Sequence, residues 1–309
     1  MVSRVQVGPN SDLRFEAMNQ RTPISGQNAG QGILWMLVAM LLFVGMDTIG
    51  KVLAQTYPVF EIVWARFLFQ LLFMAPVILS GLPNVVVSQS YRLQGLRAIM
   101  VVLTNMSMIT ALRFIPMTEV SAVASASPLI VTALSVVLLG EKVGLRRWLG
   151  VVIGFVGVLI VIRPGMGLVH PATAIPLAAA LFYAINQVTT RRLGAIDNPM
   201  TTVFYTALIG FLATSMTIPF VWTMPEPAGW GLMASMGMCS FLGQYASVRA
   251  FQAAPAATVT PFNYTILLWA TLSGYIVFDD FPDGWTLLGA LVIVGSGLYI
   301  FNRSRVASR

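Results

Sequence analysis

Apolar residues gather in ten runs along the chain, and short polar segments separate the runs. Most runs approach the roughly 20 residues that a helix needs to cross a bilayer. Helices are expected because each unpaired backbone group in hydrocarbon costs several kcal/mol, and no barrel-like alternation of polar and apolar residues is present. The runs, with boundaries good to about four residues, are Gly32 to Leu53, Phe60 to Leu82, Ala98 to Leu112, Thr118 to Leu139, Trp148 to Ile162, Ala172 to Thr190, Met200 to Trp222, Trp230 to Val248, Ala256 to Phe278, and Trp285 to Phe301.

Two of the runs are short, and flanking residues can lengthen both. The third run, Ala98 to Leu112, can extend to Leu93 if the long side chain of Arg97 snorkels to the membrane surface. The fifth run, Trp148 to Ile162, can include Leu145 in a similar way. The pattern therefore predicts an all-α polytopic membrane protein with ten transmembrane helices.

The composition agrees with this class. Among the 309 residues, 57% are hydrophobic and 9% are charged, whereas about 25% of residues are charged in soluble domains. About ten spans of roughly 20 residues use up the length, so no sizeable soluble domain is expected. Residues 1 to 31 are polar and predict a flexible cytoplasmic tail. The first apolar run is longer than the core of a signal peptide, so we expect it to remain as a span.

One segment of the sequence occurs twice. Five residues in it recur 139 positions later, with no gap between them. An unbroken shared spacing indicates internal duplication. The predicted repeats cover residues 32–165 and 172–303. Each holds five spans, an odd number, so the second repeat must cross the membrane in the opposite direction. The matched pairs are Ala111 with Ala250, Pro116 with Pro255, Val120 with Val259, Leu149 with Leu288, and Gly150 with Gly289.

Basic residues favour one side of the predicted membrane. With the N-terminus inside, only Arg113 and Arg163 fall on outer segments. An excess of Lys and Arg marks the cytoplasmic side, so both termini are predicted to be cytoplasmic. The linker after the fourth span is basic from Lys142 to Arg147, whereas its copy from Asp279 to Asp283 is acidic, as inverted repeats require. The inner basic residues are Arg4, Arg14, Arg21, Arg92, Arg97, Lys142, Arg146, Arg147, Arg191, Arg192, Arg249, Arg303, Arg305 and Arg309.

Inverted repeats indicate a transporter, because they place a substrate site near the membrane midplane and supply two arrangements of similar energy. Polar and aromatic residues in mid-span are the candidates for that site, although single ones often serve only as hydrogen bonds between helices. Amides beside Tyr and Trp suit an aromatic or zwitterionic substrate. The ninth span, which also carries Asn263, is expected to determine specificity. The predicted substrate-binding residues are Asn105, Tyr183, Asn186, Gln187, Gln244, Tyr245, Tyr264 and Trp269.

Charged residues of the first two spans are the candidates for gating or coupling. In an antiparallel helix pair, residues at equal depth have a nearly constant sum of numbers, and that sum is 113 for Asp47 with Arg66 and 112 for Lys51 with Glu61. The register predicts both pairs, although Asp47 and Lys51 are also four apart and share a helix face. These four side chains either exchange partners during transport or only lock the hairpin.

Several segments resemble the EamA family of the drug/metabolite transporter superfamily. They are Pro128 followed by Gly140-Glu141 and a glycine-rich fifth span, the segment Pro261 to Trp269, and Phe278 to Asp280 followed by Leu288-Gly289. The resemblance implies a bacterial cytoplasmic membrane transporter for amino acids, riboflavin, S-adenosylmethionine, opine-type metallophores or drugs. It implies a central cavity lined by the first, third, fourth, sixth, eighth and ninth spans. Asp279-Asp280 replaces Gly140-Glu141 in the second repeat, in an outer loop away from that cavity.

Other functional classes find no support in the sequence. The single cysteine, Cys239, and the single histidine, His170, argue against disulfides and against a metal site. No P-loop, G-x-S-x-G or H-E-x-x-H motif is present, so we expect no enzyme, no cofactor and no ATP-driven step. The net charge of +7 sits at span ends and does not indicate nucleic acid.

The preferred prediction is uptake of a metabolite such as riboflavin or S-adenosylmethionine by a secondary transporter. The alternatives are an exporter of amino acids, opine-type metallophores or drugs and, more remotely, a membrane scaffold or a membrane enzyme. Small residues predict close helix packing within one chain in preference to a dimer contact, and both a monomer and a homodimer stay open. These residues are Gly150, Gly154, Gly157, Gly289, Gly295 and Gly297.

Overall fold

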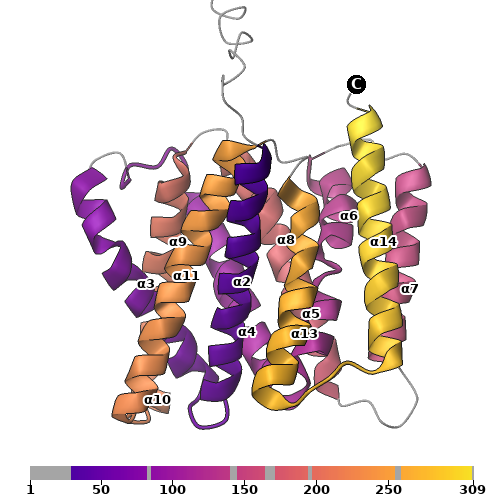
Figure 1. Ribbon diagram of the computed structural model, residues 1–309. Helices are drawn as coiled ribbons and strands as arrows, with labels where there is room; N and C mark the ends of the chain where they lie inside the picture. Colours follow the sequence, from indigo (N-terminus) through magenta and orange to yellow (C-terminus); the bar gives the residue numbers. More distant parts are fainter. Residues whose placement is uncertain are drawn as a thin grey trace, which may run out of the picture.

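The computed structural model describes residues 29–81, 85–139, 145–163, 171–193, 197–254 and 259–307. This part of the chain is helical and contains no strand (Figure 1). The predicted tail up to residue 28 and the residues Glu141, Lys142, His170 and Pro255 lie outside the described residues. The helices are α2 (Ala29–Leu53), α3 (Val59–Gly81), α4 (Tyr91–Phe114), α5 (Met117–Ala124), α6 (Ser127–Leu139), α7 (Leu145–Ile162), α8 (Ile175–Leu193), α9 (Pro199–Ser215), α10 (Ile218–Val221), α11 (Pro227–Ala253), α13 (Thr265–Phe278) and α14 (Gly284–Ala307), with 3-10 turns η1 (Pro171–Ala174) and η2 (Thr260–Tyr264).

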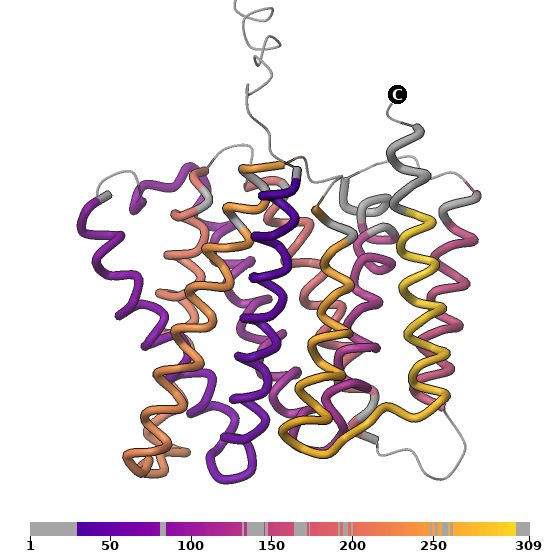
Figure 2. The backbone as a smooth tube through the Cα atoms, viewed as in Figure 1, coloured from indigo at the N-terminus to yellow at the C-terminus, as the bar shows by residue number. Residues whose placement is uncertain are grey.

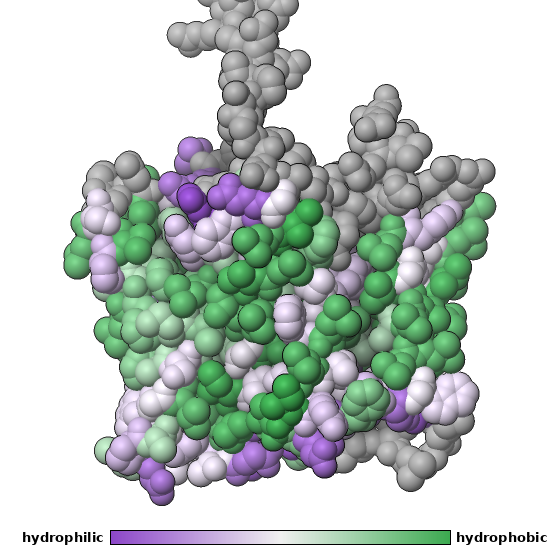
Figure 3. All heavy atoms as spheres, viewed as in Figure 1, coloured by the Kyte–Doolittle hydropathy of each residue, from purple (hydrophilic) through white to green (hydrophobic). Residues whose placement is uncertain are grey.

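The molecule is a polytopic helical membrane protein. By length and composition, the segments Gly30–Leu53, Val59–Ser80 and Tyr91–Phe114 can each cross a bilayer, and further apolar helices are somewhat shorter. Large apolar side chains such as Leu268 and Leu291 are exposed along the helices. Figure 3 shows this apolar surface as a band across the middle of the molecule, with hydrophilic residues toward both ends. Such a band fits a lipid-facing surface.

Helix bounds confirm both predicted extensions. α4 begins at Tyr91 and α7 begins at Leu145, as the length of a span requires. The snorkelling of Arg97 is wrong, because this side chain is only 7% exposed and bonds to neighbouring helices. The fourth apolar run is interrupted between α5 and α6, just before Pro128, where proline cannot donate a helical hydrogen bond. In the ninth run, the 3-10 turn η2 precedes α13.

The chain passes alternately between two ends of the bundle (Figure 2). We call these the upper end, where α2 begins and toward which α14 runs, and the lower end, where α2 gives way to α3 (Figure 1). Helix neighbours follow a regular pattern. The contact of α2 with α11 corresponds to that of α8 with α4. The contact of α2 with α13 corresponds to that of α8 with α6. In addition, α3 contacts α9, and α7 contacts α14.

Glycines bring α7 and α14 close together. A Cβ atom added to Gly289 would lie 2.5 Å from Val161 Cγ2 and 2.7 Å from the carbonyl oxygen of Gly157. One added to Gly150 would lie 2.6 Å from Ile300. Gly295 is different, since nothing lies within 4 Å of its added Cβ. Close packing of these helices within one chain is thus confirmed, with Gly295 as the exception.

Candidate functional site

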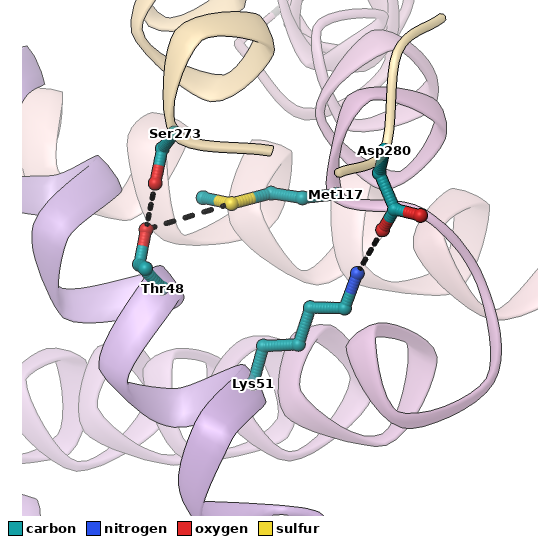
Figure 4. Close-up of polar contacts among 5 residues, drawn as sticks. All are labelled: Thr48, Lys51, Met117, Ser273 and Asp280. Atoms are coloured by element: carbon teal, nitrogen blue, oxygen red, sulfur yellow. Dashed lines mark hydrogen bonds and ion pairs between the residues drawn. The ribbon is translucent and has the colours of Figure 1, made fainter. Parts of the chain in front are cut away.

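α2 and α13 meet near the lower end through side chains that the close-up in Figure 4 shows. The Thr48 hydroxyl lies 2.6 Å from the Ser273 hydroxyl and donates weakly to Met117 Sδ at 3.6 Å. One turn further along α2, Lys51 Nζ lies 2.5 Å from Asp280 Oδ2. The same ammonium lies 4.2 Å from the centroid of the Phe278 ring, a cation–π distance. An ion pair and a hydroxyl contact therefore join the two halves of the chain here.

A tight turn after α13 positions Asp280. Asp279 takes a left-handed backbone conformation with φ of 55°. Its N–H donates to the Tyr275 carbonyl at 3.1 Å, and the N–H of Asp280 donates to the Gly274 carbonyl at 3.0 Å. These bonds satisfy carbonyls that the helix end leaves free. Gly274 leaves space for this turn. A Cβ atom added to Gly274 would lie 3.2 Å from the Asp280 carbonyl oxygen, which is a tight contact. The turn thus brings Asp280 back beside α13, facing Lys51.

This geometry corrects one sequence prediction. The pairing of Lys51 with Glu61 is wrong, because Lys51 pairs with Asp280, 229 residues away. Glu61 is fully buried and accepts the backbone N–H of Thr223 at 3.0 Å instead. Asp280 lies in the turn after α13, where it contacts Lys51, one of the residues predicted to serve gating or coupling.

Asp47 and Arg66 remain electrostatic neighbours in the first hairpin, as their register predicts. The structure records no direct ion pair between these two described residues. Arg66 is 3% exposed, its Nε donates to Met46 Sδ at 3.2 Å, and its guanidinium lies 4.8 Å from the Phe67 ring centroid. Asp47 is 8% exposed. A buried carboxylate and a buried guanidinium thus interact without a direct ion pair, and Arg66 Nη1 has no hydrogen-bond partner among the described residues.

Polar residues of α4 and α8 form a second group, which we call the α4–α8 polar strip. On α8, the Gln187 amide donates to the Tyr183 hydroxyl at 3.1 Å, and the Thr190 hydroxyl donates to the carbonyl of the buried Asn186 at 2.7 Å. From α4, Arg97 Nε donates to the Thr190 hydroxyl at 2.8 Å. The strip contains Arg97, Asn105, Tyr183, Asn186, Gln187 and Thr190.

Arg97 was missed as a site residue by the sequence reasoning. Its Nη1 donates to the Thr202 carbonyl at 3.3 Å and to the Thr206 hydroxyl on α9. The guanidinium also lies within electrostatic range of the Tyr183 hydroxyl. Its position beyond the first turn of α4, which begins at Tyr91, is the sequence signal that could have found it. Asn105 lies two turns further along α4, where its amide donates to the Val101 carbonyl at 2.7 Å.

The remaining predicted site residues lie elsewhere. Tyr245 on α11 makes an edge contact with Trp35 on α2, with ring centroids 6.3 Å apart. Gln244 beside it is half-buried. Trp269 packs against residues of α2. The Tyr264 hydroxyl instead lies against Gly297 of α14. The structure therefore brings the α8 residues together with Arg97 and sets Tyr264 apart from them.

A carboxylate at the upper end connects loops from both halves of the chain. Asp197 accepts hydrogen bonds from the Ser88 hydroxyl at 2.5 Å, the Gln89 N–H at 2.8 Å and the Gln94 amide at 2.8 Å. Burial acts to raise the pKa of Asp197, but these hydrogen bonds outweigh burial and hold the pKa below its ordinary value. Asp197 is thus a charged clamp between the segment before α4 and the segment before α9.

Family comparison identifies this helical bundle. The model of the EamA-like transporter family matches residues 30–163 and again residues 172–302. The chain belongs to the EamA-like transporter family. The predicted resemblance is therefore confirmed.

Relatives within the family carry different transport names. A riboflavin transporter of Vibrio cholerae is 31% identical, covering 87% of this chain and 92% of that protein. An S-adenosylmethionine uptake transporter of Rickettsia prowazekii is 23% identical, with the same coverage of 87% and 92%. A pseudopaline exporter of Pseudomonas aeruginosa is 28% identical, covering 85% and 93%. A solved crystal structure has the same fold, with a TM-score of 0.64 at 17% identity over 91% of this chain and 99% of the other.

Several buried polar atoms of this EamA-like transporter have no hydrogen-bond partner among the described residues. Two of them, Trp269 Nε1 and Arg66 Nη1, belong to predicted site residues that pack near α2. A buried donor without a partner costs free energy, so such groups are often satisfied by a ligand or by water.

Proposed function

We propose that this protein is a secondary transporter that takes up an aromatic or zwitterionic metabolite, such as riboflavin or S-adenosylmethionine, across the bacterial cytoplasmic membrane. The observation that carries the proposal is the family match over both halves of the chain. The names of two relatives, a riboflavin transporter and an S-adenosylmethionine uptake transporter, support the substrate class. The chain is not expected to be an enzyme, since the family is one of transporters.

The proposed architecture is ten transmembrane helices in two inverted five-helix repeats, 32–165 and 172–303, with both termini cytoplasmic. Three observations support it. Helix neighbours repeat between the halves, with α2 on α11 matched by α8 on α4. α2 begins at the upper end, toward which α14 runs (Figure 1). Basic residues gather where α4 and α7 begin and where α8 and α11 end, which is the upper end. The upper end is then cytoplasmic and the lower end is outer.

The proposed substrate site lies near the midplane and uses the α4–α8 polar strip, with aromatic and amide groups from the α2 side. The hydroxyl, amide and guanidinium groups of the strip offer donors to carbonyl or carboxylate oxygens. Trp269 and Tyr245 supply aromatic faces, and Gln244 supplies an amide. Tyr264 is the weakest candidate because its hydroxyl lies against α14. Asp47 and Arg66 are proposed to exchange interaction partners during transport and so to couple transport to the conformational change.

Purified protein in liposomes tests this function. Labelled riboflavin and labelled S-adenosylmethionine are each offered outside, and accumulation inside is followed over time. We expect time-dependent, saturable uptake of at least one compound, reduced by Asn186→Ala. The matched control is Gln55→Ala, since Gln55 is exposed in the turn after α2. No flux of either compound, together with no rise in thermal stability on adding them, would reject the proposed substrate class.

Export is the second candidate, and the pseudopaline exporter relative favours it. The buried guanidinium of Arg97, near the upper end, would suit a carboxylate-bearing opine arriving from the cytoplasm. Inside-out vesicles separate the candidates. An importer accumulates riboflavin or S-adenosylmethionine when these are offered to its outer face, whereas an exporter accumulates an opine offered to its cytoplasmic face. A scaffold would move neither compound.

A further inference from the structure

The α2–α13 contact at the lower end joins two helices from different halves of the chain by side chains alone. Lys51 and Asp280 supply the ion pair, and Thr48 and Ser273 supply the hydroxyl contact one turn deeper (Figure 4). We propose that these four residues form the outer gate of the transporter, which opens to admit substrate from outside. This inference rests on the proposed function, and it gives Thr48, Ser273 and Asp280 a role in gating.

The chemistry of the contact suits repeated opening. A hydroxyl carries one proton, so it can donate to only one acceptor at a time. The Thr48 hydroxyl has an alternative acceptor within its own helix, the Val44 carbonyl at 2.8 Å. When Ser273 moves away, Thr48 can keep a hydrogen bond without any change of backbone. Separation at this level therefore leaves no polar group stranded on α2.

The ion pair is also placed where water can take over its bonds. The side chain of Lys51 is 10% exposed and that of Asp280 is 33% exposed. A partly exposed pair is weaker than a buried one because water solvates the separated charges. Asp280 stands on the turn after α13, so a small shift of α13 carries it away. Lys51 would then lose both Asp280 and the Phe278 ring and regain water.

The α7–α14 contact shows what a permanent junction looks like in the same molecule. There, Gly289 approaches the Gly157 carbonyl so closely that an added Cβ would lie 2.7 Å from it. Backbones meet without intervening side chains. Arg163 at the end of α7 pairs with Asp283 at 2.6 Å, beside α14. That second ion pair bridges two helices that already pack tightly, so it does not need to break during transport.

Labelling of a single cysteine tests the gate without a substrate. In a Cys239→Ser background, Ser273→Cys places one thiol behind the Lys51–Asp280 pair. A membrane-impermeant methanethiosulfonate reagent is applied to right-side-out vesicles, and the labelling rate is measured. We expect slow labelling with the pair intact. Lys51→Met and Asp280→Asn should each raise the rate by about tenfold, which corresponds to about 1.4 kcal/mol.

The two variants separate gating from simple attraction of the reagent. They change the local charge in opposite directions, so an effect on a charged reagent would speed one and slow the other, whereas an opened gate speeds both. The matched control is Arg163→Met, which removes the other ion pair at the same end and should leave labelling unchanged. The charge exchange Lys51→Asp with Asp280→Lys should restore slow labelling.

Three results would overturn the proposal. They are unchanged labelling in both Lys51→Met and Asp280→Asn, equal acceleration in Arg163→Met, and labelling that rises only when the reagent is applied to the opposite face. If a Lys51 variant fails to fold, Asp280→Asn alone decides. Absence of uptake of both riboflavin and S-adenosylmethionine, with no rise in thermal stability on adding them, would reject the substrate class, while the labelling result would still decide the gate.

Discussion

Replacement of Gly289 by alanine tests whether α7 and α14 are held together by direct backbone approach. The added Cβ would lie 2.5 Å from Val161 Cγ2, 2.7 Å from the Gly157 carbonyl oxygen and 3.1 Å from the Val161 nitrogen. A side chain can rotate away from a new methyl group, but two backbone atoms cannot. The helices must therefore move apart, which loosens every contact along their interface.

The magnitude follows from two opposing terms. Alanine favours a helix over glycine by about 1 kcal/mol, while overpacking a close contact costs about 1–3 kcal/mol. Gly295→Ala, in the same helix, gains the first term without the second, because nothing lies within 4 Å of its added Cβ. The difference in the free energy of unfolding between the two variants isolates the packing cost. We expect Gly289→Ala to be less stable than Gly295→Ala by about 1–3 kcal/mol.

Thermal unfolding in detergent measures the difference. Cys239 is the single cysteine of the chain and is partly buried on α11. A thiol-reactive dye therefore reports its exposure as the protein unfolds. A difference of 1 kcal/mol shifts Tm by about 2–4 °C in a domain of this order of size. Equal Tm values for the two variants would contradict the close approach of the helices.

Three further predictions concern the charged residues. Asp47→Asn should abolish uptake in the liposome assay, because it removes the carboxylate that interacts with Arg66; normal uptake would assign Asp47 to architecture. Arg97→Gln should lower stability by about 1–2 kcal/mol and reduce uptake more strongly, and Arg97→Lys should rescue neither fully, since an ammonium lacks the planar fork that reaches both α8 and α9. The pKa of Asp197 is lower in the folded protein than when unfolded, so its contribution to stability is present above about pH 4 and is lost as the pH falls through its folded pKa. Asp197→Asn should therefore lower Tm at pH 7, and the difference in Tm between this variant and the unchanged protein should become smaller in acid. A difference in Tm that grows in acid would contradict the role of Asp197 as a clamp.

Sequence patterns predicted the helices well because a bilayer imposes a minimum length on each helix that crosses it. α4 and α7 extend past their apolar runs to Tyr91 and Leu145, as the required span length demands. The interruption of the fourth run was less visible, because apolar residues continue through it and only Pro128 marks the position. A run of hydrophobic residues reports burial in lipid and not the local hydrogen-bond pattern.

Partner choice could not be predicted in the same way. Equal depth in the membrane within one hairpin predicted that Lys51 pairs with Glu61. Depth alone, however, does not determine the direction in which a side chain faces. The turn after α13, set by Asp279 and Gly274, delivers a closer carboxylate from the other half of the chain. Arg97 was misread for a related reason. Its hydroxyl partners lie on α8 and α9, far along the sequence, so a rule based on distance from a span end could not find them.

The two proposed repeats differ most at the position of the gate. The residue 139 positions after Lys51 is Thr190, and the residue 139 positions after Thr48 is Gln187. At the position that matches Lys51, α8 therefore carries a hydroxyl group in place of the cation that α2 offers to Asp280. At the upper end the cation comes instead from Arg97 on α4, which bonds to Thr190. If the repeats were identical, exchange of their conformations would give two states of equal energy. Because Lys51 on α2 pairs with Asp280 at one end while Arg97 on α4 bonds to α8 at the other, the two ends are held by different contacts, and the two states are not expected to have equal energy.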